Sequence, residues 1–214
     1  MRDTRRPGPR RTPVRRLRFH GRIVGVGSTS GTRIVLGHWH RTPLGAFSDL
    51  MVETAAGHRV LVAPREEVAA FVGATYRFDE VRIEPVAVEV VRRSWAVRSP
   101  SLDMVLQVGR RTPAGALLHL VPEGVATRPL WSAAADPVSR VVMRGVRTRG
   151  SAGAGRREWY GATDVHAVEG LAGRFDGVDL GELAPVDPPC HFGFSSTPRR
   201  PSVTDVVTTV EVPS

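Results

Sequence analysis

The residues best suited to chemistry lie in a segment rich in arginine and glycine, residues 144–161, which holds five of each. Glycine lets the backbone approach an anion closely, and arginine offers paired N–H donors to a carboxylate or a phosphate. Trp159 and Tyr160, near the end of this segment, could form an amphipathic wall. We therefore predict a ligand-binding site made of Arg147, Arg149, Arg156, Arg157, Trp159, Tyr160 and Trp39. The alternative is a hairpin loop with solvated arginines, because the setting of a nucleotide-binding loop is missing.

Two histidines and one glutamate are candidates for acid–base or metal chemistry. His38 and His40 would face the same side of a strand, as pairs of metal ligands do, but nothing fixes a third ligand. We favour two partly exposed histidines beside a buried Trp39, and we predict no metal site and no cofactor. Glu158 is flanked by arginines and is expected to be ionised. An enzyme that uses His38, His40 or Glu158 stays open as an alternative, so the sequence does not decide whether the protein is an enzyme.

Several kinds of nucleophile are excluded or disfavoured by the residue content. All 30 basic side chains are arginines, so chemistry that needs a lysine amine is excluded. The single cysteine, Cys190, precedes His191 directly, and neighbours on a strand point to opposite faces, which is a poor arrangement for proton transfer. A Gly-x-Ser-x-Gly motif, typical of a hydrolase serine, is also missing.

The positive charge of the chain is concentrated at its N-terminus. Residues 1–18 hold eight arginines and one acid, and the remaining 22 arginines face 20 acids, which leaves a net charge of +2. We predict that residues 1–17 form a disordered Arg/Pro-rich tail, either functional or a leader from a mis-assigned start, and that residues 18–214 form one domain. Nucleic-acid binding is therefore disfavoured for the folded domain, and binding through the tail and the Gly/Arg loop is a third alternative.

The compartment and origin are predicted from composition. The sequence contains no apolar run near the ~20 residues of a membrane span and no secretory h-region, so we predict a cytoplasmic protein. The exclusive use of arginine, with abundant Ala, Gly, Val and Pro, is typical of a high-GC genome such as that of an actinobacterium.

Most of the chain alternates apolar and polar residues with the period of a β-strand. Strands of this kind at 8–12-residue spacing favour a mainly β fold, an antiparallel closed barrel or sandwich with one or two short helices. A helix is predicted over 64–73, where proline and two acids precede an apolar run, and a second helical region over 115–119 and 130–135. The predicted strands cover residues 19–26, 32–40, 46–53, 59–63, 78–83, 86–91, 94–97, 102–108, 158–166, 170–175 and 203–212.

Residues 41–52, with the sequence RTPLGAFSDLMV, precede a strand and a helix-like segment over 66–71. This stretch, about a fifth of the chain with its flanks, resembles part of the acetoacetate-decarboxylase-like family. The resemblance implies a closed, strand-rich fold around an internal pocket. It does not imply decarboxylation, because that chemistry in the family uses a Schiff-base lysine. The whole chain also resembles an uncharacterised family of actinobacterial proteins that end in a segment like residues 192–201, FGFSSTPRRP.

Taken together, the sequence predicts a β-barrel-like protein that binds a small anionic or amphipathic molecule. A barrel interior provides a pocket, and a near-neutral body disfavours a polyanionic partner. The identity of the ligand and the oligomeric state do not follow from the sequence.

Overall fold

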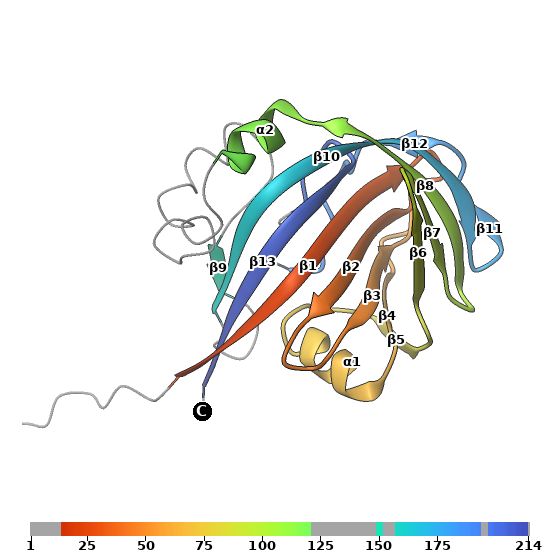
Figure 1. Ribbon diagram of the computed structural model, residues 1–214. Helices are drawn as coiled ribbons and strands as arrows, with labels where there is room; N and C mark the ends of the chain where they lie inside the picture. The colour runs from red at the N-terminus through yellow and green to blue at the C-terminus, as the bar shows by residue number, and fades with distance from the viewer. Residues whose placement is uncertain (1–13, 121–148, 152–156, 194–196, 214) are drawn as a thin grey trace, which may run out of the picture.

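The computed structural model describes residues 14–120, 149–151, 157–193 and 197–213, which fold mainly into strands with two short helices (Figure 1). The predicted mainly-β class with few helices is thus confirmed. The elements, in chain order, are β1 (Val14–Ser28), β2 (Arg33–Arg41), β3 (Phe47–Glu53), β4 (Arg59–Ala63), α1 (Glu66–Gly73), β5 (Glu80–Ile83), β6 (Ala87–Val91), β7 (Ser94–Arg98), β8 (Leu102–Arg111), α2 (Pro113–His119), β9 (Arg149–Ser151), β10 (Arg157–Phe175), β11 (Val178–Asp179), β12 (Leu183–Ala184) and β13 (Ser202–Pro213).

The strands of the described residues form one curled sheet. Its main path runs β5-β4-β3-β2-β1-β13-β10-β8-β7-β6, while β9 and β11 pair with β10 and β12 pairs with β1. All pairs on this path are antiparallel except β4 and β5, which are parallel because helix α1 carries the chain back between them. Figure 1 shows the long strands β1, β13 and β10 crossing the middle of this half barrel.

The expected closed barrel is wrong, because the two edge strands of the half barrel, β5 and β6, do not pair with each other. Pro85 follows β5 and offers no backbone N–H, so it cannot donate to a ladder there. Side chains tie this edge to the far part of the sheet instead. Arg82 donates to Asp176 at 2.6 Å, and Ser101 donates to Glu84 at 2.6 Å.

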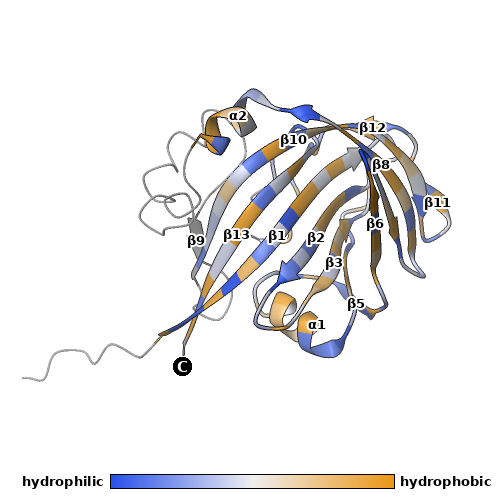
Figure 2. Ribbon diagram, viewed as in Figure 1, coloured by the Kyte–Doolittle hydropathy of each residue, from blue (hydrophilic) through white to orange (hydrophobic). Residues whose placement is uncertain are grey.

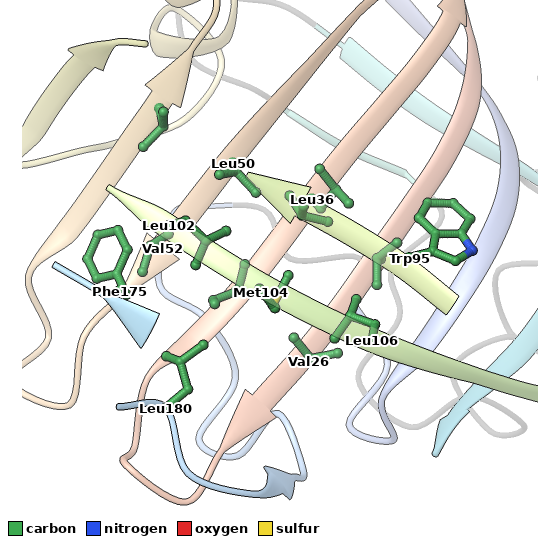
Figure 3. Close-up of a cluster of buried hydrophobic side chains, with 14 of the residues drawn as sticks. Val26, Leu36, Leu50, Val52, Trp95, Leu102, Met104, Leu106, Phe175 and Leu180 are labelled. Carbon is green, nitrogen blue, oxygen red and sulfur yellow. The ribbon is translucent and has the colours of Figure 1, made fainter. Parts of the chain in front are cut away.

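The main core lies where the two arms of the curled sheet face each other. Along β8, the buried Leu102, Met104 and Leu106 alternate with the exposed Asp103 and Gln107, which is the pattern of a strand with one face in a core. Figure 2 shows the same alternation as bands of colour along the long strands. Figure 3 shows side chains from β2 and β3 pointing toward those of β8. Each fully buried aliphatic side chain contributes about 1.5–3 kcal/mol, so this contact holds the sheet in its curl.

Helix α1 covers the opposite face of β1–β4. It begins at Glu66 and ends at Gly73, within the predicted range, and the carboxylates of its first turn lie near the positive end of the helix dipole. Its buried Val68 and Val72 pack with Phe19 of β1 and Leu61 of β4. On β4, Leu61 alternates with Val60 and Val62, which face the main core. The sheet therefore carries apolar side chains on both faces of these strands, one for each core.

The first strand begins before the predicted start of the domain at residue 18. Strand β1 begins at Val14, so residues 14–17, which were expected to belong to the disordered tail, pair with the end of β13. The sequence favoured a tail because arginines dominate there, but strand pairing satisfies their backbone whatever the side chains. The helical region expected over 130–135 lies outside the described residues. Within the described part of the chain, no helix is long and apolar enough to cross a membrane.

Candidate functional site: a cavity beside helix α1

A cavity of about 70 Å³ lies between the α1 face of the sheet and the segments that cover it. Its walls come from alternate residues of β1, β2 and β3, from β10 and β13, from α1 and the residues after it, and from the segment around Cys190. The lining residues are Phe19, Ile23, Val35, Gly37, Trp39, Phe47, Asp49, Met51, Phe71, Val72, Thr75, Tyr76, Glu158, Tyr160, Cys190, Phe192, Thr197, Thr208 and Val210.

Strand register brings the first polar pair of the cavity together. Gly37 of β2 lies opposite Asp49 of β3, and Trp39 lies two residues further along the same face. The indole Nε1 of Trp39 donates to Asp49 Oδ1 at 3.0 Å. A Cβ on residue 37 would lie 2.4 Å from each of these two atoms. The glycine is therefore what leaves room for the tryptophan to reach the carboxylate.

The carboxyl group of Asp49 is perturbed by its burial in the cavity wall. Its residue is 4% exposed, and burial raises its pKa from 3.8 to about 7, while the hydrogen bond from Trp39 opposes this rise. A buried charge without a cation is costly, so the carboxyl group keeps its proton to near-neutral pH. Asp49 can therefore take up or release a proton in the physiological range.

A second polar cluster joins three segments that are distant in sequence. The hydroxyl of Tyr76 donates to Glu158 Oε2 at 3.0 Å and lies 2.5 Å from the hydroxyl of Tyr160. Burial, followed by the charge of Glu158, raises the pKa of Tyr76 well above its ordinary value, so this phenol stays protonated. The cluster offers a ligand one carboxylate and two phenol oxygens in an otherwise apolar wall.

Within the described residues, the hydroxyl of one residue of the cavity wall has no hydrogen-bond partner. Thr208 Oγ1 is buried, and among the described residues no donor or acceptor reaches it. Buried polar atoms are paired in more than about nine of ten cases, so the unpaired hydroxyl of a residue that lines the cavity is an exception that calls for a partner.

The segment around Cys190, which forms part of the cavity wall, is held by hydrogen bonds to a buried ion pair. Arg33 and Glu53, exposed by only 5% and 2%, lie 3.0 Å apart, and Glu53 accepts hydrogen bonds from both the backbone and the ring of His191. The neighbouring Cys190 faces the cavity, and burial, with a smaller effect of Glu53, raises the pKa of its thiol to about 12. The thiol is thus a neutral part of the wall, and its histidine neighbour is turned to another partner.

The predicted ligand-binding residues have different places in the structure. Trp39 and Tyr160 line the cavity, whereas Trp159 is half-buried and does not line it, because neighbours on a strand point to opposite faces. The remaining predicted site residues are arginines: Arg147 and Arg156 lie outside the described residues, and Arg149 and Arg157 are described only as backbone, in β9 and at the start of β10.

Of the candidates for an enzyme, only Glu158 reaches the cavity. His38 lies on the other face of β2, where its ring packs edge-on against Trp95 at 5.8 Å and its Nδ1 is 2.9 Å from Ser48 Oγ. Burial, with smaller effects of Arg22 and His40, lowers the pKa of His38, so its ring is neutral.

Among the described residues, a cluster outside the cavity has the spacing of a metal site. Ligand atoms of Asp164, His166 and Asp205 lie within 4.8 Å of one another. Both carboxylates are already bound by arginines, Asp164 by Arg111 at 2.7 Å and Asp205 by Arg22 at 2.6 Å. Guanidinium groups therefore occupy the positions that a cation would need, and this arrangement does not favour a metal.

Asp49, Tyr76 and Thr208 line the cavity and were not predicted as site residues. One signal for Asp49 was present, because it alternates with Phe47 and Met51 on the apolar side of a strand, and a carboxylate in that position is a buried acid. For Tyr76 and Thr208 no local pattern marks a site, since both belong to segments whose neighbours are set by the tertiary fold.

No family model and no curated protein matches the sequence. Among solved structures, the chain is similar to the crystal structure of acetoacetate decarboxylase from Legionella pneumophila subsp. pneumophila str. Philadelphia 1, with a TM-score of 0.39 and 9% identity over 98% of this chain and 91% of that chain. A similarity this low gives no information about chemistry.

Proposed function

We propose that the protein binds a small amphipathic molecule in the cavity beside helix α1. The observation that carries the proposal is the buried hydroxyl of Thr208, which has no partner among the described residues and belongs to a residue of the mostly apolar wall that also holds Asp49. Apolar walls with a few convergent polar groups are the usual construction of a small-molecule site. One buried water needs roughly 10–15 Å³, so the 70 Å³ of the cavity takes a ligand of about five non-hydrogen atoms.

The polar groups of the wall favour a ligand that donates hydrogen bonds. Within the described residues the lining holds two carboxyl groups, Asp49 and Glu158, and no basic side chain. A carboxylate ligand would meet like charge in a medium of low dielectric constant, which is unfavourable. An anionic ligand, as the sequence favoured, would depend on the arginines of residues 144–157.

Three probes of nearly equal shape test both the site and its charge preference. Isobutanol, isobutylamine and isobutyrate are titrated at pH 8 into the full-length protein, and binding is followed by tryptophan fluorescence and by thermal shift. We expect the alcohol or the amine to bind and isobutyrate to bind at least about tenfold more weakly, since an unfavourable buried charge costs more than 1.4 kcal/mol. Stronger binding of isobutyrate would contradict the charge preference, and no binding of any probe would contradict the site.

A pair of neighbouring threonines provides the matched variants. Thr208→Val removes the unpartnered hydroxyl and is expected to weaken binding about tenfold, because one hydrogen bond in a buried site contributes about 1 kcal/mol or more. Thr209 is equally buried but does not line the cavity, so Thr209→Val should leave affinity unchanged. Equal affinities of the two variants would contradict the assigned site.

A second candidate function is proton transfer, favoured by the pKa of about 7 at Asp49 inside the cavity. A general acid or base works best when its pKa lies near the working pH, and Asp49 meets this condition while Tyr76, held in its protonated form, can stabilise developing negative charge. The test is deuterium uptake by carbon from D2O into any ligand retained by the protein. Uptake that is lost in Asp49→Asn with binding retained would support an enzyme, and uptake unchanged in that variant would exclude this role.

A further inference from the structure

Five arginines line one groove on the sheet face opposite the cavity, where the main core opens at one side. The groove has a volume of about 360 Å³. The arginines come from β1, from the turn between β6 and β7, and from the end of β8, and we name the site the arginine groove after Arg22, Arg92, Arg93, Arg110 and Arg111.

Two of these arginines are held in place. Arg22 lies 2.6 Å from Asp205, and its guanidinium is 5.5 Å from the ring centre of the buried Trp95. Arg111 lies 2.7 Å from Asp164. These contacts neutralise two of the charges and fix a polar rim around an apolar floor. A rim that is already ordered loses little freedom when a ligand binds.

The other three arginines form no ion pair with a carboxylate of the described residues. Arg92, Arg93 and Arg110 are exposed, and no ion pair joins them to any of the described residues. Like charges gathered around one groove repel one another, and an anion between them relieves this repulsion. Guanidinium groups also match the geometry of phosphate oxygens, which they bind through paired N–H donors.

The backbone conformation of Arg92 also supports a functional role for this groove. It lies in the two-residue turn between Val91 and Ser94 with a φ of 56°, in the left-handed region that favours glycine or asparagine. A glycine would form this turn at lower cost. The strain lies at a charged residue beside the groove, and strained backbone of this kind clusters at ligand-binding sites.

We propose that the arginine groove binds a small phosphate-bearing molecule, independently of the cavity ligand. Phosphate is favoured over an apolar carboxylate because three unmatched arginines can share several anionic oxygens. A small molecule is favoured over a nucleic acid because the groove, with a volume of about 360 Å³, has the size of a small-molecule site and not of an extended track for a phosphate backbone.

Titration calorimetry with inorganic pyrophosphate tests the site in the full-length protein, at constant ionic strength. The variant Arg93→Gln/Arg110→Gln is expected to bind at least about tenfold more weakly, since each lost guanidinium removes a charge-assisted hydrogen bond. The control is Arg200→Gln, which removes an exposed arginine outside the groove. The arginines of residues 1–18 contribute equally to all variants. An equal loss in the control, or no loss in the double variant, would overturn the proposal.

The strained turn gives a second, independent readout. Arg92→Gly should weaken pyrophosphate binding severalfold while leaving the thermal midpoint unchanged or higher, because it removes a charge and relieves the left-handed backbone. A lower midpoint together with unchanged binding would contradict the role of this residue. A short DNA duplex serves as competitor: tighter binding of the duplex, lost in the same double variant, would overturn the small-molecule assignment in favour of a nucleic acid.

Discussion

Replacing Asp49 by asparagine should remove a large pH dependence of stability. In the folded protein this carboxyl group holds its proton up to about pH 7, whereas the unfolded chain releases it near 3.8. Between these values the unfolded state binds fewer protons than the folded state, so the free energy of unfolding falls as pH rises and is level above pH 7. The shift of about three pKa units corresponds to about 4 kcal/mol.

Urea unfolding of the wild type and of Asp49→Asn at several pH values between 4 and 8 measures this effect. Asparagine imitates the protonated acid and can still accept the hydrogen bond from Trp39, so the variant lacks this titration while other acids cancel in the comparison. We expect the stability of the wild type relative to the variant to fall by about 4 kcal/mol from pH 4 to pH 8. Asp103→Asn, at an exposed position, should show no such change. Parallel curves for the wild type and Asp49→Asn would refute the raised pKa.

Two further results are expected. Gly37→Ala should destabilise the fold by about 1–3 kcal/mol in urea unfolding, because its Cβ would lie 2.4 Å from both Asp49 Oδ1 and Trp39 Nε1. Gly73→Ala, with no atom within 4 Å of the added Cβ, should change the free energy of unfolding by less than about 1 kcal/mol. Equal effects of the two substitutions would contradict the steric account. The thiol of Cys190, with its pKa raised to about 12, should react with Ellman's reagent at pH 8 roughly a thousandfold more slowly in the native than in the unfolded chain, whereas similar rates would show that the cavity wall is open.

The strands and the first helix were predictable because their signals are local. Alternation of apolar and polar residues predicted β8, and a proline with two acids before an apolar run predicted α1. These patterns depend on the side-chain period of a strand and on the electrostatics of a helix start, and both act over a few residues.

The closure of the sheet was not predictable in this way. Whether the first and last strands of a curled sheet pair depends on strand order, stagger and the path between β5 and β6, none of which is encoded in one short segment. Here Pro85 offers no backbone N–H after β5, and Arg82 joins that edge to Asp176 through its side chain. A pairing between residues distant in sequence is decided by tertiary packing.

The candidate site was also predictable only in part. Trp39, Glu158 and Tyr160 were selected from their chemistry, and the structure places all three around one cavity. The raised pKa of Asp49 and the hydrogen bonds of Tyr76 could not be read from the sequence, since they depend on burial and on which groups face each other across the fold.

By itself, the sequence determined the β-strand period, the start of helix α1 and the absence of a lysine amine, because each is a property of residue types and their spacing. Only the tertiary structure decided that the sheet stays open, that carboxyl and phenol groups gather in a cavity on one face, and that five arginines line a groove on the other. Burial and the distance between charges depend on which residues the fold brings together, so neither can be read from residue types and their spacing.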